Sequence, residues 1–211
     1  ELDNTLILFM SDNGADTVRG PLWGLVSNTP FRRSKVWTHE GGIATPLIAH
    51  WPSGIPAARN GAIIPGYGHF IDLLPTCLEA AGAEHPRVFH GEAVAPLEGV
   101  SLLPALQGRR ALPEDRILYW ERQGNEAIRQ GNWKLVRGYN DGKADGAPDG
   151  EGPRAGAWEL HDLATDPGET RDLSTEHPGL VKELLARYEA WAGRVGVVPR
   201  ERIVEATQTG Q

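Results

Sequence analysis

The feature that most constrains the fold lies near the start of the chain, where an apolar run ends in a carboxylate and an amide. Residues 5–10, TLILFM, show no alternation of polar and apolar side chains, and Asp12, Asn13 and Gly14 follow almost at once. A short unbroken apolar run bounded by turn residues is typical of a strand buried on both faces, as in a parallel sheet covered by helices. The run therefore predicts an α/β domain with a mostly parallel sheet flanked by helices.

Two further segments extend this predicted domain. Residues 46–51, PLIAHW, form a second short apolar run, which the turn-forming sequence PSGIP ends. Residues 69–81, HFIDLLPTCLEAA, have apolar side chains at helical spacing, and Gly82 is suited to the C-terminal cap. Pro75 lies inside this segment, so the helix either bends there or begins as a short turn and restarts at Pro75. We place the α/β domain at residues 1–110.

The pattern changes after residue 110. Short, partly alternating segments separated by Gly and Asn turns predict a small antiparallel sheet over residues 116–121, 126–130, 133–138 and 158–163. Residues 139–157 are rich in Gly, Asp and Pro, a composition typical of a flexible segment. An amphipathic helix is expected over residues 178–191. We assign residues 111–198 to this second domain and residues 199–211 to a loose tail.

Composition excludes several classes of partner and structure. The chain has 211 residues and a formal charge of −7, which argues against nucleic acid or an anionic membrane surface as its main partner. No apolar run approaches the roughly 20 residues that a membrane-spanning helix needs. Cys77 is the only cysteine, which excludes an intrachain disulfide; we expect a periplasmic or secreted protein, and a single cysteine is also compatible with the cytosol. Its place on the apolar side of the expected helix predicts a core residue.

Asp12 and Asn13 are the first candidate site residues, because ligands of open parallel sheets bind at the carboxyl ends of strands. A carboxylate and an amide oxygen are hard ligands, which suit Ca²⁺ or Mg²⁺ rather than Zn²⁺. Asp-Asn-Gly is also a common turn sequence, and two residues alone cannot supply the about six to eight oxygens of a Ca²⁺ shell. Both interpretations, a turn and part of a metal site, remain open from these residues alone.

A second candidate site lies in residues 31–46, FRRSKVWTHEGGIATP, where cations gather in an acidic protein. Lys35 offers a point charge for an anion, and His39 offers an imidazole that titrates near neutrality. A solvated basic loop with a glycine hinge accounts for the same residues. The chain contains no serine nucleophile elbow, phosphate loop or dinucleotide fingerprint, and the acidic residues of the segment 139–157 lack EF-hand spacing.

Together these segments resemble a known family. NTLILFMSDNG, PFRRSKVWTHEGGIATPLIAHWP, HFIDLLPTCLEAAG, GVSLLPAL, GNEAIRQGNWKLV and WELHDLATDPGETRDL occur in this order. Over residues 3–192 the chain resembles the C-terminal half of a sulfatase, in particular the bacterial arylsulfatases of the alkaline phosphatase superfamily. The resemblance rests on the ordered succession rather than on one motif. It implies an alkaline phosphatase-like fold and a hydrolase that acts on small-molecule or saccharide sulfate esters.

The resemblance also implies roles for the candidate residues. Asp12 and Asn13 match the pair that completes a Ca²⁺ site together with two aspartates of the N-terminal half. Lys35 matches the lysine that contacts the substrate sulfate and helps to stabilise the leaving oxygen. His39 lies at the EGG segment and is carried over as a substrate-pocket residue. Related two-zinc phosphatases have a histidine beside the aspartate, so an asparagine favours a single hard cation, Ca²⁺ before Mg²⁺.

The chain departs from the family pattern in ways that matter for activity. The formylglycine nucleophile, made from Cys or Ser in a Cys/Ser-x-Pro/Ala-x-Arg motif, is absent, and Cys77 cannot serve that motif. We expect it in an N-terminal half upstream of Glu1, so the isolated chain should be inactive and poorly soluble. Val36 follows Lys35 where many relatives have glycine. A phosphoesterase or phosphonate hydrolase of the same superfamily, or a non-catalytic remnant, are the alternatives.

Overall fold

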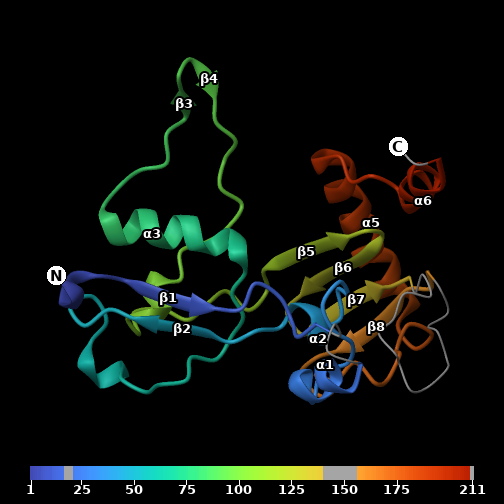
Figure 1. Ribbon diagram of the computed structural model, residues 1–211, viewed down its shortest axis with the longest axis horizontal. Helices are drawn as coiled ribbons and strands as arrows, with labels where there is room; N and C mark the ends of the chain where they lie inside the picture. The colour runs from blue at the N-terminus through green and yellow to red at the C-terminus, as the bar shows by residue number, and fades with distance from the viewer. Residues whose placement is uncertain (17–20, 140–155, 210–211) are drawn as a thin grey trace. The chain divides into compact units, whose positions relative to one another are not determined.

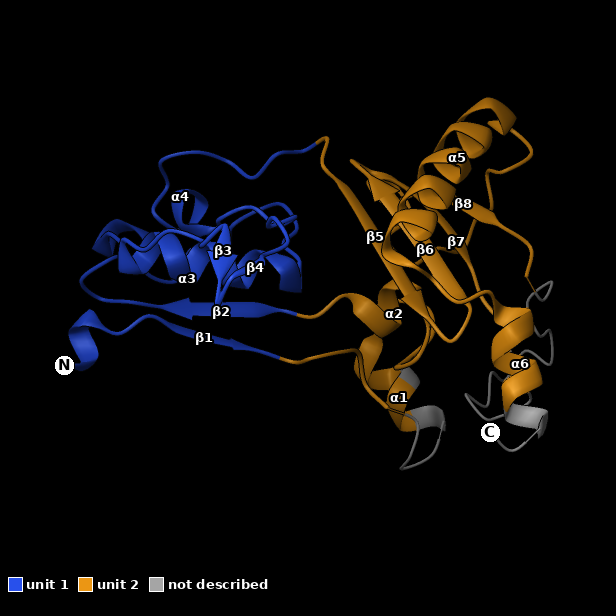
Figure 2. Cartoon of the chain, turned by 90° about the horizontal axis from the view of Figure 1, so that it is seen from above, with its two compact units in different colours: residues 1–10, 46–114 blue, residues 11–45, 115–211 orange. Residues whose placement is uncertain are grey.

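The computed structural model describes residues 1–16, 21–139 and 156–209, and the chain divides into two compact units (Figures 1 and 2). Unit 1 comprises Glu1–Met10 and Pro46–Glu114, and unit 2 comprises Ser11–Thr45 and Asp115–Gln211. The segment 11–45, expected to belong to the first domain, therefore packs with the unit that holds the C-terminal sheet. Most of the segment expected to be flexible, residues 139–157, lies outside the described residues.

Unit 1 contains both strands that the apolar runs predict, but not the predicted parallel sheet. Strand β1 (Ile7–Met10) pairs antiparallel with β2 (Leu47–His50), and every strand pair in the described parts of the chain is antiparallel. The predicted burial on both faces is also wrong, since Phe9 is 69% and Ile48 59% exposed. An apolar run favours burial, but it fixes neither the direction of the neighbouring strand nor the layer that covers it. A two-stranded ribbon buries little by itself.

The helix predicted over residues 69–81 is confirmed, with a 3₁₀ start. Turn η3 (Phe70–Asp72) leads into α3 (Leu73–Ala81), and the Asp72 carboxylate accepts a hydrogen bond of 2.7 Å from the His69 N–H. Pro75 lies in the first turn of α3, where proline is tolerated because its missing N–H has no helical partner there. Gly82 caps the C-terminal end with a φ of 62°, as predicted.

The predicted core position of Cys77 is wrong, because its thiol is exposed. The buried residue of α3 is its neighbour Thr76, whose hydroxyl donates to Asp72 O and accepts from the Leu102 N–H. A polar side chain thus joins α3 to the segment that precedes α4. The remaining elements of unit 1 are η1 (Leu2–Asn4), η2 (Ala57–Arg59), β3 (Val88–Phe89), β4 (Glu92–Ala93) and α4 (Leu103–Leu106).

Unit 2 contains the predicted antiparallel sheet, which is confirmed in all four strands. The strands pair in chain order as a meander: β5 (Ile117–Arg122), β6 (Asn125–Gln130), β7 (Trp133–Arg137) and β8 (Glu159–Asp162). Each hairpin turn between β5, β6 and β7 contains a glycine with positive φ, Gly124 and Gly131, which suits the tight reversal. The local alternation of polar and apolar residues, together with the turn residues, is sufficient to predict this sheet.

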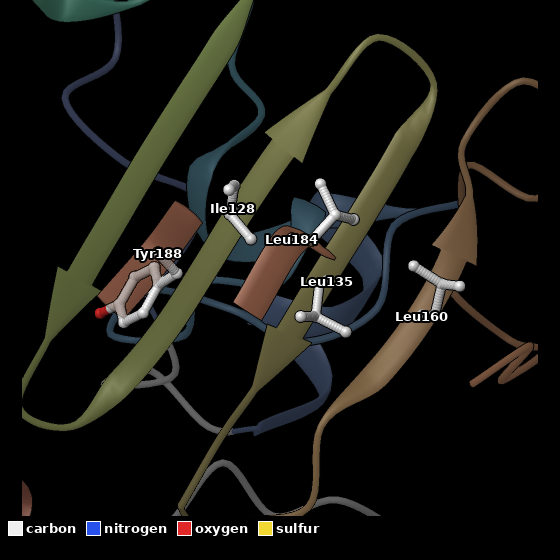
Figure 3. Packing of buried hydrophobic residues seen from close by; sticks show 5 residues of the cluster. All are labelled: Ile128, Leu135, Leu160, Leu184 and Tyr188. Atoms are coloured by element: carbon white, nitrogen blue, oxygen red, sulfur yellow. The ribbon is translucent and has the colours of Figure 1, made fainter. Parts of the chain in front are cut away.

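One face of this sheet packs on the predicted C-terminal helix, α5 (Pro178–Val195). Ile128, Leu135 and Leu160 lie opposite one another on β6, β7 and β8, and Leu184 and Tyr188 of α5 pack against them (Figure 3). These five side chains form the buried hydrophobic cluster between this face of the sheet and α5. Burial of their apolar surface supplies the main stabilisation of this unit.

The other helices of unit 2 lie where the sequence indicates loops. Helix α1 (Pro21–Asn28) and the short α2 (Glu40–Ile43) belong to the segment 11–45. Helix α6 (Arg200–Thr209) occupies most of the segment expected to be a loose tail. The described helices include none that is both long and apolar enough to cross a membrane.

Candidate functional site

The second face of the C-terminal sheet carries a row of basic side chains. Arg129, Lys134 and His161 lie opposite one another on β6, β7 and β8, one position along from the core residues. Because side chains alternate along a strand, this row points away from α5. Lys134 and His161 are nevertheless fully buried. The segment 11–45 supplies their cover, since Glu40 lies 2.8 Å from the Lys134 ammonium.

The covering segment contains a closed loop, residues 32–42, which we call the Lys35 loop. Arg32 O accepts a 2.9 Å hydrogen bond from the Gly41 N–H, which joins the two ends of this loop. Lys35 and Val36 are exposed, whereas Arg33, Ser34 and residues 37–42 are buried. The loop therefore presents the Lys35 ammonium to solvent from a buried base.

Close backbone packing brings the Asp12–Asn13–Gly14 segment against the Lys35 loop. The Gly14 N–H donates to Gly42 O at 2.9 Å, and the Lys35 N–H donates to Ala15 O at 3.1 Å. A Cβ atom on Gly14 would lie only 1.8 Å from Gly41 O, so glycine is required for this approach. The structure thus brings together the two candidate sites that lie about twenty residues apart in the sequence.

Asn28 of α1 strengthens this junction, and the sequence alone did not single it out. Its amide Oδ1 accepts from the Ala15 N–H at 2.8 Å, and its Nδ2 donates to Arg33 O at 3.1 Å. One buried side chain therefore bonds to both segments. Its position in a stretch that reads as a loop gave no signal for this role.

Asp12 is exposed and Asn13 half-buried, immediately before this junction. The Ser11 hydroxyl donates to Asn13 O at 2.8 Å, so the segment forms the turn that its composition indicates. Among the described residues, no group of three or more His, Cys, Asp and Glu side chains is placed to hold a metal ion. The carboxylate and amide oxygens of Asp12 and Asn13 suit a hard cation, but they provide only part of a Ca²⁺ shell.

The Lys35 ammonium pairs with a carboxylate that the sequence analysis did not select. Its Nζ lies 3.1 Å from Asp16 Oδ2, and both side chains are nearly half exposed. An ion pair at such an exposed position is weak. An anionic ligand can therefore compete with Asp16 for the ammonium group.

His39 lies in the buried base of the loop rather than at its exposed tip. The imidazole is 1% exposed, its ring meets Trp37 edge-to-face, and neither ring nitrogen has a hydrogen-bond partner within the described residues. Burial, together with the positive charges of Arg32 and Lys134, holds its pKa well below the usual value. His39 is therefore a neutral, buried side chain at neutral pH, and its predicted role in the substrate pocket stays a prediction.

Charged groups fix both ends of the Lys35 loop to the sheet. At one end Arg32 Nη2 donates to Glu159 Oε2 at 2.5 Å, and His161 Nε2 lies 3.2 Å from the same oxygen. Burial alone would raise the pKa of Glu159, but the His161 hydrogen bond and the charge of Arg32 outweigh it and lower the pKa to about 2. Glu159 is thus a carboxylate at all ordinary pH values.

At the other end, Lys134 Nζ lies 2.8 Å from Glu40 Oε1 and 2.9 Å from Glu169 Oε1. Glu169 Oε2 also accepts from the Glu40 N–H at 2.7 Å, at the first residue of α2. Sequence reasoning missed Lys134 because a charged residue that alternates with apolar ones in a strand is expected to face solvent. It missed Glu169 because this residue lies in an irregular segment 129 positions from Glu40.

Comparison with known proteins shows which family the chain resembles. The family model described as Sulfatase matches residues 1–83. An uncharacterised sulfatase of Schizosaccharomyces pombe is 30% identical over 233 aligned residues, which cover 94% of this chain and 39% of the relative. Human arylsulfatase A is 33% identical, and the alignment covers 87% of this chain and 36% of that protein.

A solved structure agrees with these relatives. The structure of BT4656 in complex with its substrate D-glucosamine-2-N,6-O-disulfate matches with a TM-score of 0.62 and 26% identity, and it covers 95% of this chain and 37% of the other. The chain therefore spans less than two fifths of the length of each of these proteins. It belongs to the sulfatase family and carries part of a sulfatase domain.

Proposed function

We propose that the full protein containing this chain hydrolyses sulfate monoesters, and that Lys35 is its catalytic residue within this chain. The observation that carries the proposal is the junction of the Lys35 loop with the Asp12–Asn13–Gly14 segment, through the Gly14–Gly42 and Lys35–Ala15 hydrogen bonds. This junction joins an exposed ammonium group to a segment with two hard oxygen ligands. A sulfate monoester needs both kinds of group, because it is anionic and gains charge on its bridging oxygen as the S–O bond breaks.

Lys35 is suited to the leaving oxygen. Its ammonium is exposed on a loop whose other residues, apart from Val36, are buried or half-buried, so the backbone of Lys35 is held in place while its charge stays accessible. A fixed positive charge directed at the oxygen that becomes negative stabilises the transition state more than the ground state. In this role Asp16 holds the ammonium of the free protein until the substrate sulfate displaces it.

Asp12 and Asn13 would hold Ca²⁺, with further oxygen ligands from outside this chain. Both side chains have oxygen donors, and Gly14 fixes the segment against the Lys35 loop. A bound dication would withdraw charge from the sulfate oxygens. The nucleophile of this proposal, a formylglycine, would likewise come from outside the 211 residues. His39 would shape the pocket from below as a neutral imidazole.

The substrate class that we propose is a small-molecule or saccharide sulfate ester. The relative BT4656 was solved with a disulfated glucosamine as its substrate, which supports a sugar sulfate here. The acidic net charge of −7 disfavours polyanionic nucleic acid as a competitor.

The test uses the full-length product of the gene, expressed together with a formylglycine-generating enzyme. It is assayed against an aryl sulfate, a sulfated glucosamine and the matching phosphate ester. We expect sulfate hydrolysis that chelation of Ca²⁺ abolishes, and a loss of about 3 kcal/mol of transition-state stabilisation in Lys35→Ala. Lys182→Ala, at an exposed position of α5, is the matched control.

Two results would contradict the proposal. A preference for the phosphate ester would favour a phosphoesterase of the same superfamily. Undiminished kcat/KM in Lys35→Ala would remove Lys35 from the chemistry while leaving the family assignment intact.

A further inference from the structure

A small set of charged side chains is mostly or fully buried between the C-terminal sheet and the Lys35 loop. Lys134 and Glu169 have fully buried side chains, and those of Glu40 and Arg129 are 10% and 16% exposed. The Lys134 ammonium bridges the two carboxylates, and Arg129 Nη1 lies 3.9 Å from Glu40 Oε2. Two cations and two carboxylates balance, so the cluster carries no net charge.

Stability alone is a weak reason for such a cluster. Removing charges from water costs several kcal/mol for each ion, and well-packed apolar residues of similar size often serve equally well. An ion pair differs from an apolar contact in its direction, because each donor and acceptor must meet at one distance and angle. A buried charge cluster therefore fixes geometry, and the segment that it holds here is the base of the Lys35 loop.

The contacts lead in short steps from the cluster to the closed base of the loop that carries Lys35. Glu169 holds the N–H of Glu40, and Lys134 holds its carboxylate, so both the backbone and the side chain of Glu40 are fixed. The next residue, Gly41, donates to Arg32 O and closes the loop. A side chain cannot be accommodated at this closure, because a Cβ on Gly41 would lie 2.3 Å from both Arg32 O and Arg33 O.

We propose that Lys134, Glu40 and Glu169 form a positioning device, through which the C-terminal sheet sets the place of the Lys35 ammonium. The inference rests on the proposed function of Lys35 and extends it, since it gives the sheet of β5, β6, β7 and β8 a part in activity. Lys134 touches no substrate in this proposal. It acts through Glu40 and the loop.

The decisive variant is Lys134→Met in the full-length, formylglycine-bearing protein, because methionine keeps much of the volume and removes the charge. Leu184→Ala is the matched control, since it weakens the same sheet from the opposite face. At a temperature where both variants are folded by circular dichroism, we expect Lys134→Met to lower kcat about ten- to a hundredfold. KM should change less, and Leu184→Ala should lower Tm without lowering kcat.

A double-variant cycle with Lys35→Ala separates positioning from general damage. If the cluster acts through Lys35, adding Lys134→Met to Lys35→Ala lowers kcat further by less than about threefold. If Lys134→Met lowers kcat by the same factor in the wild type and in Lys35→Ala, the proposal is overturned. A Lys134→Met variant that keeps the kcat of the wild type also overturns it. Glu40→Gln preserves the shape of the side chain and repeats the test if Lys134→Met does not fold.

Hydrogen exchange tests the device without reference to activity. We expect faster exchange of the Trp37, Gly41 and Gly42 amides in Lys134→Met, and unchanged exchange there in Leu184→Ala. Wild-type protein without sulfatase activity would overturn the proposed function, and the exchange result would then still decide whether the cluster fixes the loop. Unchanged exchange in Lys134→Met would overturn the positioning device even in an active sulfatase.

Discussion

The β1/β2 ribbon and the C-terminal sheet contrast sharply in how their faces are covered. The β1/β2 ribbon of unit 1 exposes Phe9 and Ile48, whereas Leu135 and Leu160 of the C-terminal sheet are fully buried. In unit 2, α5 covers one face and the segment 11–45 covers the other, so even Lys134 is removed from water. The comparison teaches that the covering segment, rather than the strand, decides whether a side chain belongs to a core.

The exposed apolar side chains of unit 1 extend beyond its ribbon. They include Ile63, Phe70, Leu74, Val88 and Phe89. Soluble monomers rarely expose contiguous apolar patches of more than a few hundred Å². The matched relatives are more than twice as long as this chain, and we propose that the remaining part of a sulfatase domain covers these side chains.

The largest expected effect separates the two sheets directly. Leu160→Ala should destabilise the C-terminal sheet by about 2–5 kcal/mol, because it leaves a cavity in a closed core. Phe9→Ala should cost less than about 0.5 kcal/mol and should reduce aggregation of the isolated chain. Urea denaturation, monitored by tryptophan fluorescence, measures the free energy of unfolding of both variants. Equal losses in the two variants would refute the contrast between the units.

A smaller effect is expected where the segment 11–45 closes on itself. Gly41→Ala should destabilise unit 2 by about 1–3 kcal/mol, since the added Cβ meets the carbonyl oxygens of Arg32 and Arg33. Gly179→Ala on α5 is the control, because a Cβ there meets no atom within 4 Å beyond its chain neighbours and the backbone of its own helix. A helical alanine should raise stability instead. Thermal melts show whether Tm falls in Gly41→Ala and rises in Gly179→Ala. An unchanged Tm in Gly41→Ala would show that the loop backbone shifts to accommodate the Cβ.

The pH dependence of unit 2 tests the other tie between loop and sheet. Glu159 has its pKa lowered from 4.5 to about 2, so below pH 4.5 the unfolded chain binds a proton that the folded chain does not. The stabilisation is therefore complete above that range and is lost as the pH falls toward 2. Glu159→Gln should flatten this part of the curve of unfolding free energy against pH. An unchanged slope would mean that Glu159 gains nothing from Arg32 and His161.

The smallest effect concerns Val36, next to Lys35. Its φ of 86° lies in the left-handed region, which costs a β-branched residue about 1–2 kcal/mol. Val36→Gly should remove this strain and, after the entropy cost of glycine, stabilise the protein by about 0.5–1 kcal/mol. Differential scanning calorimetry can resolve the gain. A lower Tm in Val36→Gly would show instead that the half-exposed valine side chain contributes packing.

The sequence predicts those parts of the molecule that follow from local patterns. The four strands of unit 2, α5 and the Gly82 cap all depend on alternation, helical spacing or a single turn residue. The antiparallel direction of β1/β2 and the exposure of Cys77 depend on neighbours far along the chain. For this reason no local pattern indicated them.

The candidate site shows the same division. Asp12, Asn13 and Lys35 were selected from their own segments, and the backbone contacts of Gly14 and Ala15 bring those segments together. The partners that hold the site lie elsewhere, as Glu169 does for Glu40 across 129 positions. Long-range pairs of this kind need the fold before they can be recognised.

One topological feature bears on how the protein can be divided. Met10 pairs with Leu47, so the segment 11–45 leaves unit 1 and returns to it at the same place. The β1/β2 ribbon therefore holds together the two ends of a segment that belongs to unit 2. A version of the protein that begins near residue 110 would contain the C-terminal sheet without the segment 11–45, which covers one of its faces. In such a truncated protein, Lys134 and His161 would be open to water.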